Sequence, residues 1–385
     1  MTEVKIALRR FRLMMLSLFM VVGSLNFASP ALALNALPSG YLKTSKNKIV
    51  DENGRTVRIM GVTWFGFETP NMVVHGLWAR PYRSMMDQMV ALGFNTIRLP
   101  YSNAILTAGA DSVSSVLWRL NPDLQGKTPM QILDMIIAYA GTIGLKVILD
   151  DHALEPTTNG ETNGYWYNGS RSEAQWIADW QTLAARYANN PTVIGADLYN
   201  EPTGTWGTGQ QDDWARAAKA AGDAIGRVNR NWLIVVQGLR CYNDNYYWWG
   251  GELEGVRDYP IKLALSNRLV YSTHDYPVSI WTQPWFSDPS YPANLSSVWD
   301  KYWGFIESQQ IAPVLIGEFG SRLETTSDRQ WAEAMSNYLA QRKIDWLWFS
   351  WNANGEPRGV LSDDWTTPDP ARLQYLQNLM NVTRP

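Results

Sequence analysis

Short apolar runs alternate with longer segments of helical periodicity from about residue 56 to the end of this chain. The alternation is typical of βαβ units, in which helices join parallel strands. The predicted strands are residues 56–62, 95–99, 146–150, 193–199, 232–237, 269–273, 314–317 and 346–350. The predicted helices are residues 80–92, 130–142, 172–187, 212–228, 295–309, 329–342 and 370–380. The pattern predicts an α/β fold, a single (β/α)8 TIM barrel with long βα loops.

An open, doubly wound sheet is the alternative for such a pattern. That fold needs a glycine-rich phosphate turn early in the chain, and residues 61–66 hold no Gly-x-Gly-x-x-Gly motif. Upstream of the first barrel strand, Asp51-Glu52-Asn53-Gly54 separates residues 41–50 from residues 55–60. An Asn-Gly pair between two β-rich runs predicts a short N-terminal β-hairpin that turns at residues 51–54.

The N-terminus has the layout of a secretory signal peptide. Lys5, Arg9, Arg10 and Arg12 precede an apolar run at residues 13–27, and Ala31-Leu32-Ala33 supplies a small-x-small cleavage site. We therefore expect a signal peptide at residues 1–33 and a catalytic domain at residues 34–385. A retained membrane anchor is the alternative, although Gly, Ser, Asn and Pro interrupt the run. The expected product is secreted and free of the membrane once the signal is removed.

Composition excludes several classes of function. A net charge of -3 gives no basic excess for binding nucleic acid. One cysteine and three histidines argue against a disulfide framework or a metal cluster, so no cofactor is expected. The 20 tryptophans can pack a core or form platforms for flat ligands, and composition alone leaves both readings open.

Two glutamates follow predicted strands of the barrel, Glu201 after the fourth and Glu318 after the seventh. In such a barrel the carboxyl ends of the strands share one face, where active sites lie. Two carboxyl groups facing each other across a cleft are what cleavage of a glycosidic bond requires. A separation of ~5 Å favours retention of configuration and a wider gap favours inversion, and the sequence leaves this open.

Five motifs at the predicted strand ends together resemble glycoside hydrolase family 5. They are Asn95-Thr96-Ile97-Arg98, Leu198-Tyr199-Asn200-Glu201-Pro202, His274-Asp275-Tyr276, Gly317-Glu318-Phe319-Gly320 and Trp348-Phe349-Ser350-Trp351. Residues 61–78 and 246–251 are similar to its branch of bacterial secreted endo-β-1,4-glucanases. The resemblance covers essentially the whole chain after residue 41.

The resemblance implies a retaining mechanism with assigned roles. Glu318 is expected to be the nucleophile, and Glu201 the general acid and then the general base. Arg98 and Tyr276 would keep Glu318 ionised, and Asn200 would hydrogen-bond the 2-hydroxyl of the sugar next to the broken bond.

Further residues are expected to bind substrate or support the site. His152 and His274 would orient groups in the cleft, whereas His75 either lines the cleft or supports a loop. Trp351 would form the floor under the sugar at the cleavage point. The remaining candidates are Trp78 and Trp249, as platforms along the cleft, and Tyr101 at the end of the second strand.

The implied activity is that of an endo-β-1,4-glucanase acting on β-glucan polysaccharide or oligosaccharide, as a monomer without a nucleic-acid partner. A β-mannanase or a xyloglucan- or mixed-linkage-glucan-cleaving enzyme is the nearest alternative, because the catalytic set is shared. A carbohydrate-binding barrel without activity is a further alternative, against which the two intact glutamates argue.

Overall fold

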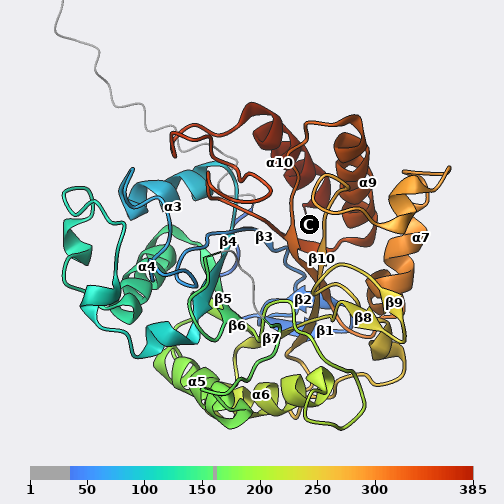
Figure 1. Ribbon diagram of the computed structural model, residues 1–385, viewed down its shortest axis with the longest axis horizontal. Helices are drawn as coiled ribbons and strands as arrows, with labels where there is room; N and C mark the ends of the chain where they lie inside the picture. The colour runs from blue at the N-terminus through green and yellow to red at the C-terminus, as the bar shows by residue number, and fades with distance from the viewer. Residues whose placement is uncertain (1–34, 159–162, 385) are drawn as a thin grey trace, which may run out of the picture.

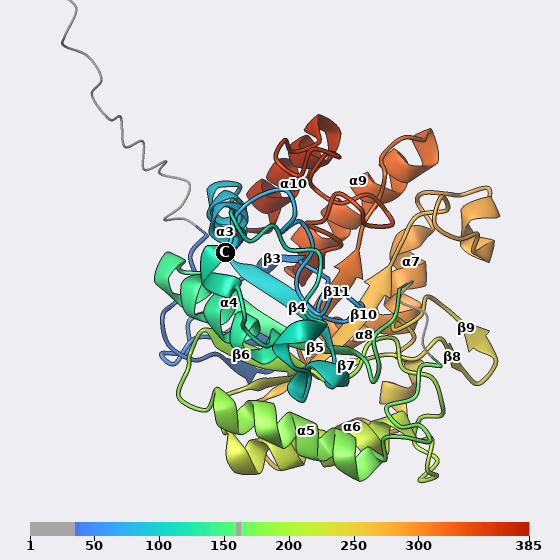
Figure 2. The same ribbon diagram turned by 60° about the vertical axis from the view of Figure 1, so that its left-hand side comes forward.

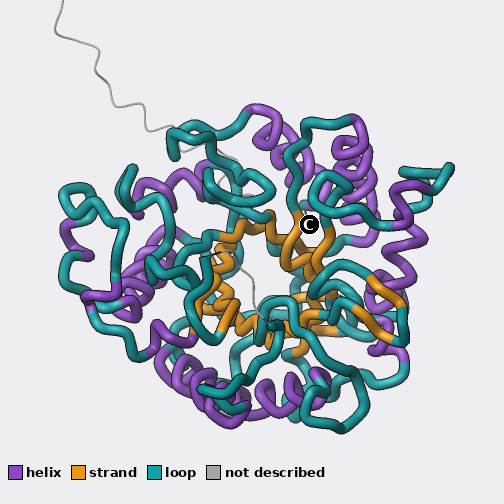
Figure 3. The backbone as a smooth tube through the Cα atoms, viewed as in Figure 1, coloured by secondary structure: helices purple, strands orange, loops and turns teal. Residues whose placement is uncertain are grey.

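The computed structural model describes residues 35–158 and 163–384, so the predicted signal peptide at residues 1–33 lies outside the described residues. Within these residues, eight parallel strands close into a barrel, ordered β10-β11-β12-β3-β4-β5-β6-β7 (Figures 1 and 3). The barrel strands are β3 (Met60–Thr63), β4 (Thr96–Ser102), β5 (Lys146–Ala153), β6 (Val193–Asp197), β7 (Leu233–Gln237), β10 (Leu269–Asp275), β11 (Val314–Phe319) and β12 (Asp345–Trp348). The predicted (β/α)8 barrel is confirmed.

Helices surround the ring of strands, as the turned view in Figure 2 shows for α5 and α6 on one side and α9 and α10 on another. The α-helices are α3 (Tyr82–Ala91), α4 (Pro129–Ile143), α5 (Glu173–Arg186), α6 (Trp214–Val228), α7 (Leu295–Trp299), α8 (Phe305–Ser308), α9 (Thr326–Arg342) and α10 (Pro370–Thr383). The predicted helix at residues 295–309 consists of α7, the π-helical segment η6 (Asp300–Gly304) and α8.

Local sequence explains where these helices start and stop. Helix α4 begins at a capping box in which Thr128 and Gln131 exchange side-chain and backbone hydrogen bonds, and it ends at Gly144 with φ of 82°. Helix α5 begins with the same device, made by Ser172 and Gln175. Capping boxes satisfy backbone N–H groups that a helix start leaves free, and a left-handed glycine terminates a helix without strain.

The N-terminal hairpin is present, but its turn differs from the predicted one. Strands β1 (Lys43–Ser45) and β2 (Lys48–Val50) pair around a turn at Lys46, which has φ of 53°. The tip is held by tertiary contact, because Nδ2 of Asn47 donates 2.6 Å to Oε1 of Glu307. The chain also reverses at the predicted residues 51–54, but there Val50 and Thr56 pair only through an isolated β-bridge and not through two strands.

The loops after several barrel strands carry small elements of their own. They include the two-stranded sheet β8 (Cys241–Tyr242) and β9 (Asn245–Tyr246) and the short 3-10 helices η1 (Asn103–Leu106), η2 (Ala110–Ser112), η3 (Pro122–Leu124), η4 (Glu254–Arg257) and η5 (Pro284–Ser287). These insertions agree with the predicted long βα loops. No helix among the described residues is both long and apolar enough to cross a bilayer.

The buried apolar side chains of the described residues form two clusters. The smaller one fills the barrel interior with residues such as Ile148, Val235 and Leu347, and the hairpin residues Leu42 and Ile49 join it. The larger one lies between the strands and the surrounding helices. Because both clusters fix the strands, polar side chains at the carboxyl ends of those strands are held on a rigid frame.

Candidate active site

The polar side chains at the carboxyl ends of the strands converge on one cluster. Arg98 lies on β4, His152 on β5, His274 on β10 and Glu318 on β11, whereas Asn200 and Glu201 lie in the loop that follows β6. Hydrogen bonds and ion pairs connect all of them. The structure therefore brings together the residues that the sequence placed at separate strand ends.

Glu318 is buried and both of its carboxylate oxygens have partners. Nη1 of Arg98 donates 2.5 Å to Oε1, and the hydroxyl of Tyr276 donates 2.9 Å to Oε2. Burial alone would raise the pKa of Glu318. The nearby His274 and Arg98 outweigh burial and, with the hydrogen bond from Tyr276, lower the pKa of Glu318 to about 2. Glu318 is thus an ionised carboxylate at neutral pH.

Arg98 is completely buried at the centre of a ring of acceptors. Its Nε donates 2.9 Å to Asp197 and its Nη2 donates 2.9 Å to Oδ1 of Asn200, while Asp150 lies 3.0 Å away. Burial opposes the charge of Arg98, but these carboxylates and Glu318 raise its pKa. The guanidinium is therefore a fixed cation that orients four neighbours at once, Glu318 included.

Asp197 was not singled out by the sequence. It ends β6, and Gln237 at the end of β7 donates 3.0 Å to its carboxylate from Nε2. Burial raises the pKa of Asp197 to about 6, against the effect of Arg98. An acidic residue in an otherwise apolar strand, four residues before Glu201, was the available signal.

Glu201 has an environment unlike that of Glu318. Its side chain is 32% exposed, against 6% for Glu318. The backbone of Glu201 is left-handed, with φ of 47°, and its N–H donates 2.8 Å to Oε1 of Gln237. Strained backbone of this kind in a non-glycine residue is concentrated at functional sites.

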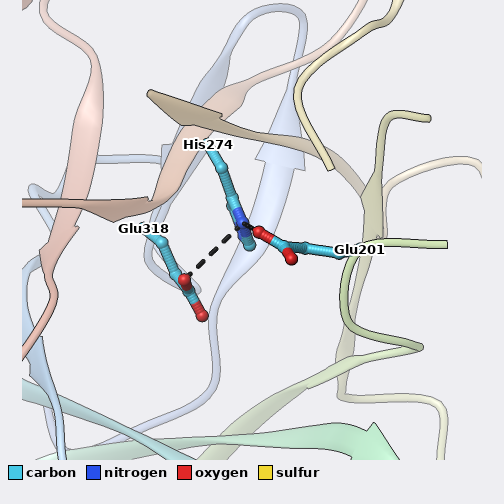
Figure 4. A group of neighbouring side chains, drawn as sticks. All are labelled: Glu201, His274 and Glu318. Carbon is cyan, nitrogen blue, oxygen red and sulfur yellow. Dashed lines mark hydrogen bonds and ion pairs between the residues drawn. The ribbon is translucent and has the colours of Figure 1, made fainter. Parts of the chain in front are cut away.

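His274 lies between the two glutamates (Figure 4). Its Nδ1 is 3.0 Å from Oε1 of Glu201 and 3.7 Å from Oε2 of Glu318. One oxygen of each glutamate and a nitrogen of His274 all lie within 4.8 Å of one another. This separation fits the retaining arrangement, in which the carboxyl groups are ~5 Å apart, and not the wider inverting one.

His152 and Asn200 complete the inner cluster. Nδ1 of His152 is 2.7 Å from Oδ2 of Asp150, and its Nε2 is 3.3 Å from Nδ2 of Asn200. Burial lowers the pKa of His152, but the carboxylate of Asp150 outweighs burial and raises it to about 9. The buried Glu68, which the sequence did not single out, acts in the same direction, and burial raises its own pKa to about 7.

Most tryptophans are buried, including Trp176, Trp180 and Trp214, which pack between helices and barrel as expected. Trp351 is also fully buried, because it packs into the larger apolar cluster. It offers no open face in this structure, which does not support the expected stacking floor. The tryptophans that retain appreciable exposure are Trp78, Trp118, Trp249 and Trp281.

Trp249 belongs to a pair of surface rings. The ring of Trp281, which is 57% exposed, packs edge-on against the ring of Trp249 with 6.1 Å between the ring centres. The guanidinium of Arg240 lies 4.5 Å from the centre of the Trp249 ring. The next residue, Gly250, lies against the side chain of Glu201. Trp281 was not predicted from the sequence, where it is marked only as an aromatic residue in the loop after β10.

His75 and Tyr101 have supporting positions. His75 is buried, and its ring nitrogens contact Thr69 at 3.1 Å and Asn354 at 3.2 Å. Burial lowers the pKa of His75 to about 4, and its ring packs beside Trp78. His75 therefore supports the loop of Trp78. Tyr101 is buried edge-on against Trp180, outside the cluster around the glutamates.

Glu201, His274 and Glu318 are spaced closely enough to ligate a metal ion. Their existing partners disfavour that use, since Arg98 and Tyr276 already occupy both oxygens of Glu318. A guanidinium at 2.5 Å would also repel a divalent cation. The donor set suits a carboxylate nucleophile better than a metal centre.

Comparison with known proteins gives a consistent result. Residues 50–355 match the sequence model of the family described as Cellulase (glycosyl hydrolase family 5). The endoglucanase of Paenibacillus polymyxa is 46% identical over 361 residues, which cover 91% of this chain and 90% of that protein. The major extracellular endoglucanase of Xanthomonas campestris pv. campestris is 38% identical over 376 residues, with 94% and 76% covered.

Solved structures agree. The catalytic domain of the Xanthomonas campestris enzyme matches with a TM-score of 0.84 and 37% identity, covering 89% of this chain and all of that one (100%). A complex of the endocellulase from Pyrococcus horikoshii with cellotetraose matches with a TM-score of 0.83 and 34% identity, covering 90% of this chain and 100% of that one. The chain therefore belongs to glycosyl hydrolase family 5, the cellulase family, and is a glycoside hydrolase.

Proposed function

We propose that this enzyme is an endo-β-1,4-glucanase that cleaves internal bonds of cellulose-type β-glucans with retention of configuration. One observation carries the proposal: the oxygens of Glu201 and Glu318 approach within 4.8 Å, yet their environments differ sharply. Glu318 is buried and bound by a cation, whereas Glu201 is partly exposed and hydrogen-bonded to His274. Two carboxyl groups in such contrasting surroundings can divide the nucleophile and acid roles.

In the first step, Glu201 gives its proton to the glycosidic oxygen as that bond to the anomeric carbon breaks. The carboxylate of Glu318 attacks the same carbon from the opposite face and forms a glycosyl ester. Asn200, fixed by Arg98, is placed to hydrogen-bond the 2-hydroxyl, an interaction that strengthens in the transition state.

In the second step, Glu201 is a carboxylate and removes a proton from water. The resulting hydroxide attacks the anomeric carbon, the ester bond breaks, and the electron pair returns to Glu318. Two inversions give net retention. Tyr276 and Arg98 stabilise the leaving carboxylate, which is an ionised group at the pH of the reaction.

Glucan specificity is supported by the relatives, which are named endoglucanases, and by the cellotetraose bound to the Pyrococcus horikoshii structure. The test compares hydrolysis rates on carboxymethyl cellulose, barley β-glucan, xyloglucan and mannan. We expect the first two to be cleaved fastest, with an early fall in viscosity. Preference for mannan would make the enzyme a β-mannanase, and preference for xyloglucan would place it with the xyloglucan-cleaving relatives.

The retaining mechanism has its own test. NMR of the first products should show the β-anomer before mutarotation. In Glu201→Ala, cleavage of a polysaccharide should fall by about 10²- to 10⁴-fold, while an aryl cellobioside with a good leaving group still forms the ester. Added azide should then yield the β-glycosyl azide. An α-anomeric first product would overturn the mechanism.

Export is part of the same proposal and is supported by the extracellular endoglucanase among the relatives. We propose that residues 1–33 form a signal peptide and residues 34–385 the secreted, monomeric catalytic domain. Mass spectrometry of the protein in the culture medium should give an N-terminus at Leu34. A product that begins at Met1 and stays with the membrane would contradict export by cleavage.

A further inference from the structure

A further buried carboxylate, Asp275, lies directly behind the catalytic cluster. Asp275, the last residue of β10, is 1% exposed and sits between His274 and Tyr276 in sequence. Successive side chains of a strand point to opposite sides. His274 and Tyr276 therefore contact the two glutamates, whereas Asp275 points to the surrounding helices.

Asp275 is held by three donors from three separate segments. Trp299 on α7 donates 3.0 Å from Nε1 to Oδ2, and Trp331 on α9 donates 2.6 Å from Nε1 to Oδ1. The hydroxyl of Tyr247 donates to Oδ2 as well, and itself accepts 3.1 Å from Nε1 of Trp303. Such a buried carboxylate is satisfied only while all donors keep their places.

The anchor lies where the sheet is irregular. The register of β10 against β11 shifts between Thr273 and His274, and beyond the shift His274 pairs with Glu318. A shift of this kind disrupts the ladder of backbone hydrogen bonds locally. The end of β10 therefore depends on other contacts for its position, and the carboxylate of Asp275 supplies them.

The hydrogen bond between Asp275 and Tyr247 also fixes the loop that lies beside Glu201. Tyr247 begins a segment in which Trp248 packs edge-on against Tyr276 at 5.8 Å and Gly250 lies against Glu201. One carboxylate thus ties the strand that carries His274 and Tyr276 to the loop beside Glu201.

We propose that Asp275 is a positioning residue that sets His274 and Tyr276 against the two catalytic glutamates. The proposal rests on the proposed function, because it assigns those glutamates to catalysis. Asp275 touches neither substrate nor reacting atoms and acts through its two neighbours. A displacement of 1 Å at such groups costs about a hundredfold in rate.

Asp275→Asn tests the proposal at constant side-chain size. The amide nitrogen cannot accept a hydrogen bond, so at least one of the donors Tyr247, Trp299 and Trp331 loses its acceptor. We expect kcat to fall about a hundredfold with little change in KM. We also expect the acid limb of the pH profile of kcat/KM to move to higher pH, because the weakened hydrogen bond from Tyr276 stabilises the ionised Glu318 less.

The acid limb reports on Glu318 only if its other neighbours stay in place. Those neighbours are Arg98 from β4, His152 from β5, His274 from β10 and Glu201 after β6. The matched control is Asp345→Asn, a buried carboxylate at the opposite end of the barrel that accepts from the N–H of Ile59. It should lose stability but keep the wild-type kcat and pH profile.

A folded Asp275→Asn variant with wild-type kcat and pH profile would overturn the proposal. If that variant does not fold, Tyr247→Phe removes one donor and keeps the ring, and it should shift kcat and the acid limb in the same direction. The substrate preference of the wild-type enzyme tests the proposed function, whereas the ratio of variant to wild-type rates tests the role of Asp275. An enzyme that prefers mannan refutes the glucanase assignment, and the variant-to-wild-type ratio on mannan still tests Asp275.

Discussion

The hydroxyl of Tyr276 donates a 2.9 Å hydrogen bond to Oε2 of Glu318, while Arg98 binds the other oxygen of the same carboxylate. Tyr276 directly follows β10 and Arg98 lies on β4, so the two oxygens are bound from opposite sides of the barrel. Burial alone would raise the pKa of this carboxylate, and the nearby His274, together with Arg98 and the hydrogen bond from Tyr276, lowers it instead.

Tyr276→Phe should raise the pKa of Glu318, because it removes a hydrogen bond that favours the charged form. The acid limb of kcat/KM should move to higher pH, and kcat should fall roughly ten- to a hundredfold, the worth of one hydrogen bond to a charged group. Rates on barley β-glucan from about pH 2 to 8 would measure both effects. An unmoved acid limb would mean that the hydroxyl does not control the ionisation of Glu318.

Glu318→Ala should abolish hydrolysis, with a loss of roughly 10⁴- to 10⁶-fold, since no other group can form the glycosyl ester. Binding of cello-oligosaccharides should persist, because stacking and hydrogen bonds elsewhere in the cleft are unchanged. Calorimetric titration and a sensitive fluorogenic assay measure the two quantities. The exposed Glu324, changed to Ala, is the control and should retain full activity. Wild-type turnover in Glu318→Ala would refute the nucleophile assignment.

The stability of the enzyme should decline at alkaline pH through His152. The pKa of His152 in the folded state, about 9, lies above the ordinary histidine pKa of 6.5 because the carboxylate of Asp150 stabilises the charged ring. The stabilisation from this pair is therefore fully present below pH 6.5 and is lost as the pH rises through 9.

Urea unfolding of the wild type at several pH values between these two limits should show a free energy of unfolding that falls as the pH rises. His152→Gln should flatten that dependence. His75→Gln is the matched control, because burial lowers the pKa of His75 to about 4 and the ring does not titrate in this range. The same slope in His152→Gln and wild type would contradict the expectation.

Trp249→Ala should weaken substrate binding without altering chemistry. A ring beside the loop of Glu201 offers stacking worth about 1 kcal/mol, so KM should rise roughly fivefold on polymeric substrate. The kcat should stay within about twofold of wild type. Initial rates on barley β-glucan and on a short aryl cellobioside separate binding along the cleft from catalysis. A large loss of kcat on both substrates would instead place Trp249 at the reaction centre.

The barrel and the two glutamates could be predicted because their signals are local. A strand is marked by a short apolar run, and Glu201 and Glu318 follow the runs at residues 193–199 and 314–317. The rule that strand ends share one face then brings them together without knowledge of any contact. The same reasoning placed Arg98 and His274 correctly at the cluster.

Features that depend on contacts between distant segments could not be predicted. The three donors to Asp275 come from positions 28, 24 and 56 residues away, and nothing in their spacing links them. The burial of Trp351 depends on the apolar cluster around it. The hairpin turn at Lys46 likewise depends on the contact of Asn47 with Glu307, whereas the Asn-Gly pair at residues 53–54 is a purely local signal.

The N-terminal hairpin closes the barrel at the end opposite the glutamates. Leu42 and Ile49 enter the interior cluster, and Nζ of Lys146 at the start of β5 donates to the carbonyls of Ser39 and Gly40. Substitutions in this hairpin can therefore change the stability of the enzyme without altering the side chains that contact the polysaccharide. For engineering, the two ends of the barrel can be changed separately. Substitutions at the hairpin end alter stability, whereas substitutions at the end that carries the two glutamates alter turnover and glycan specificity.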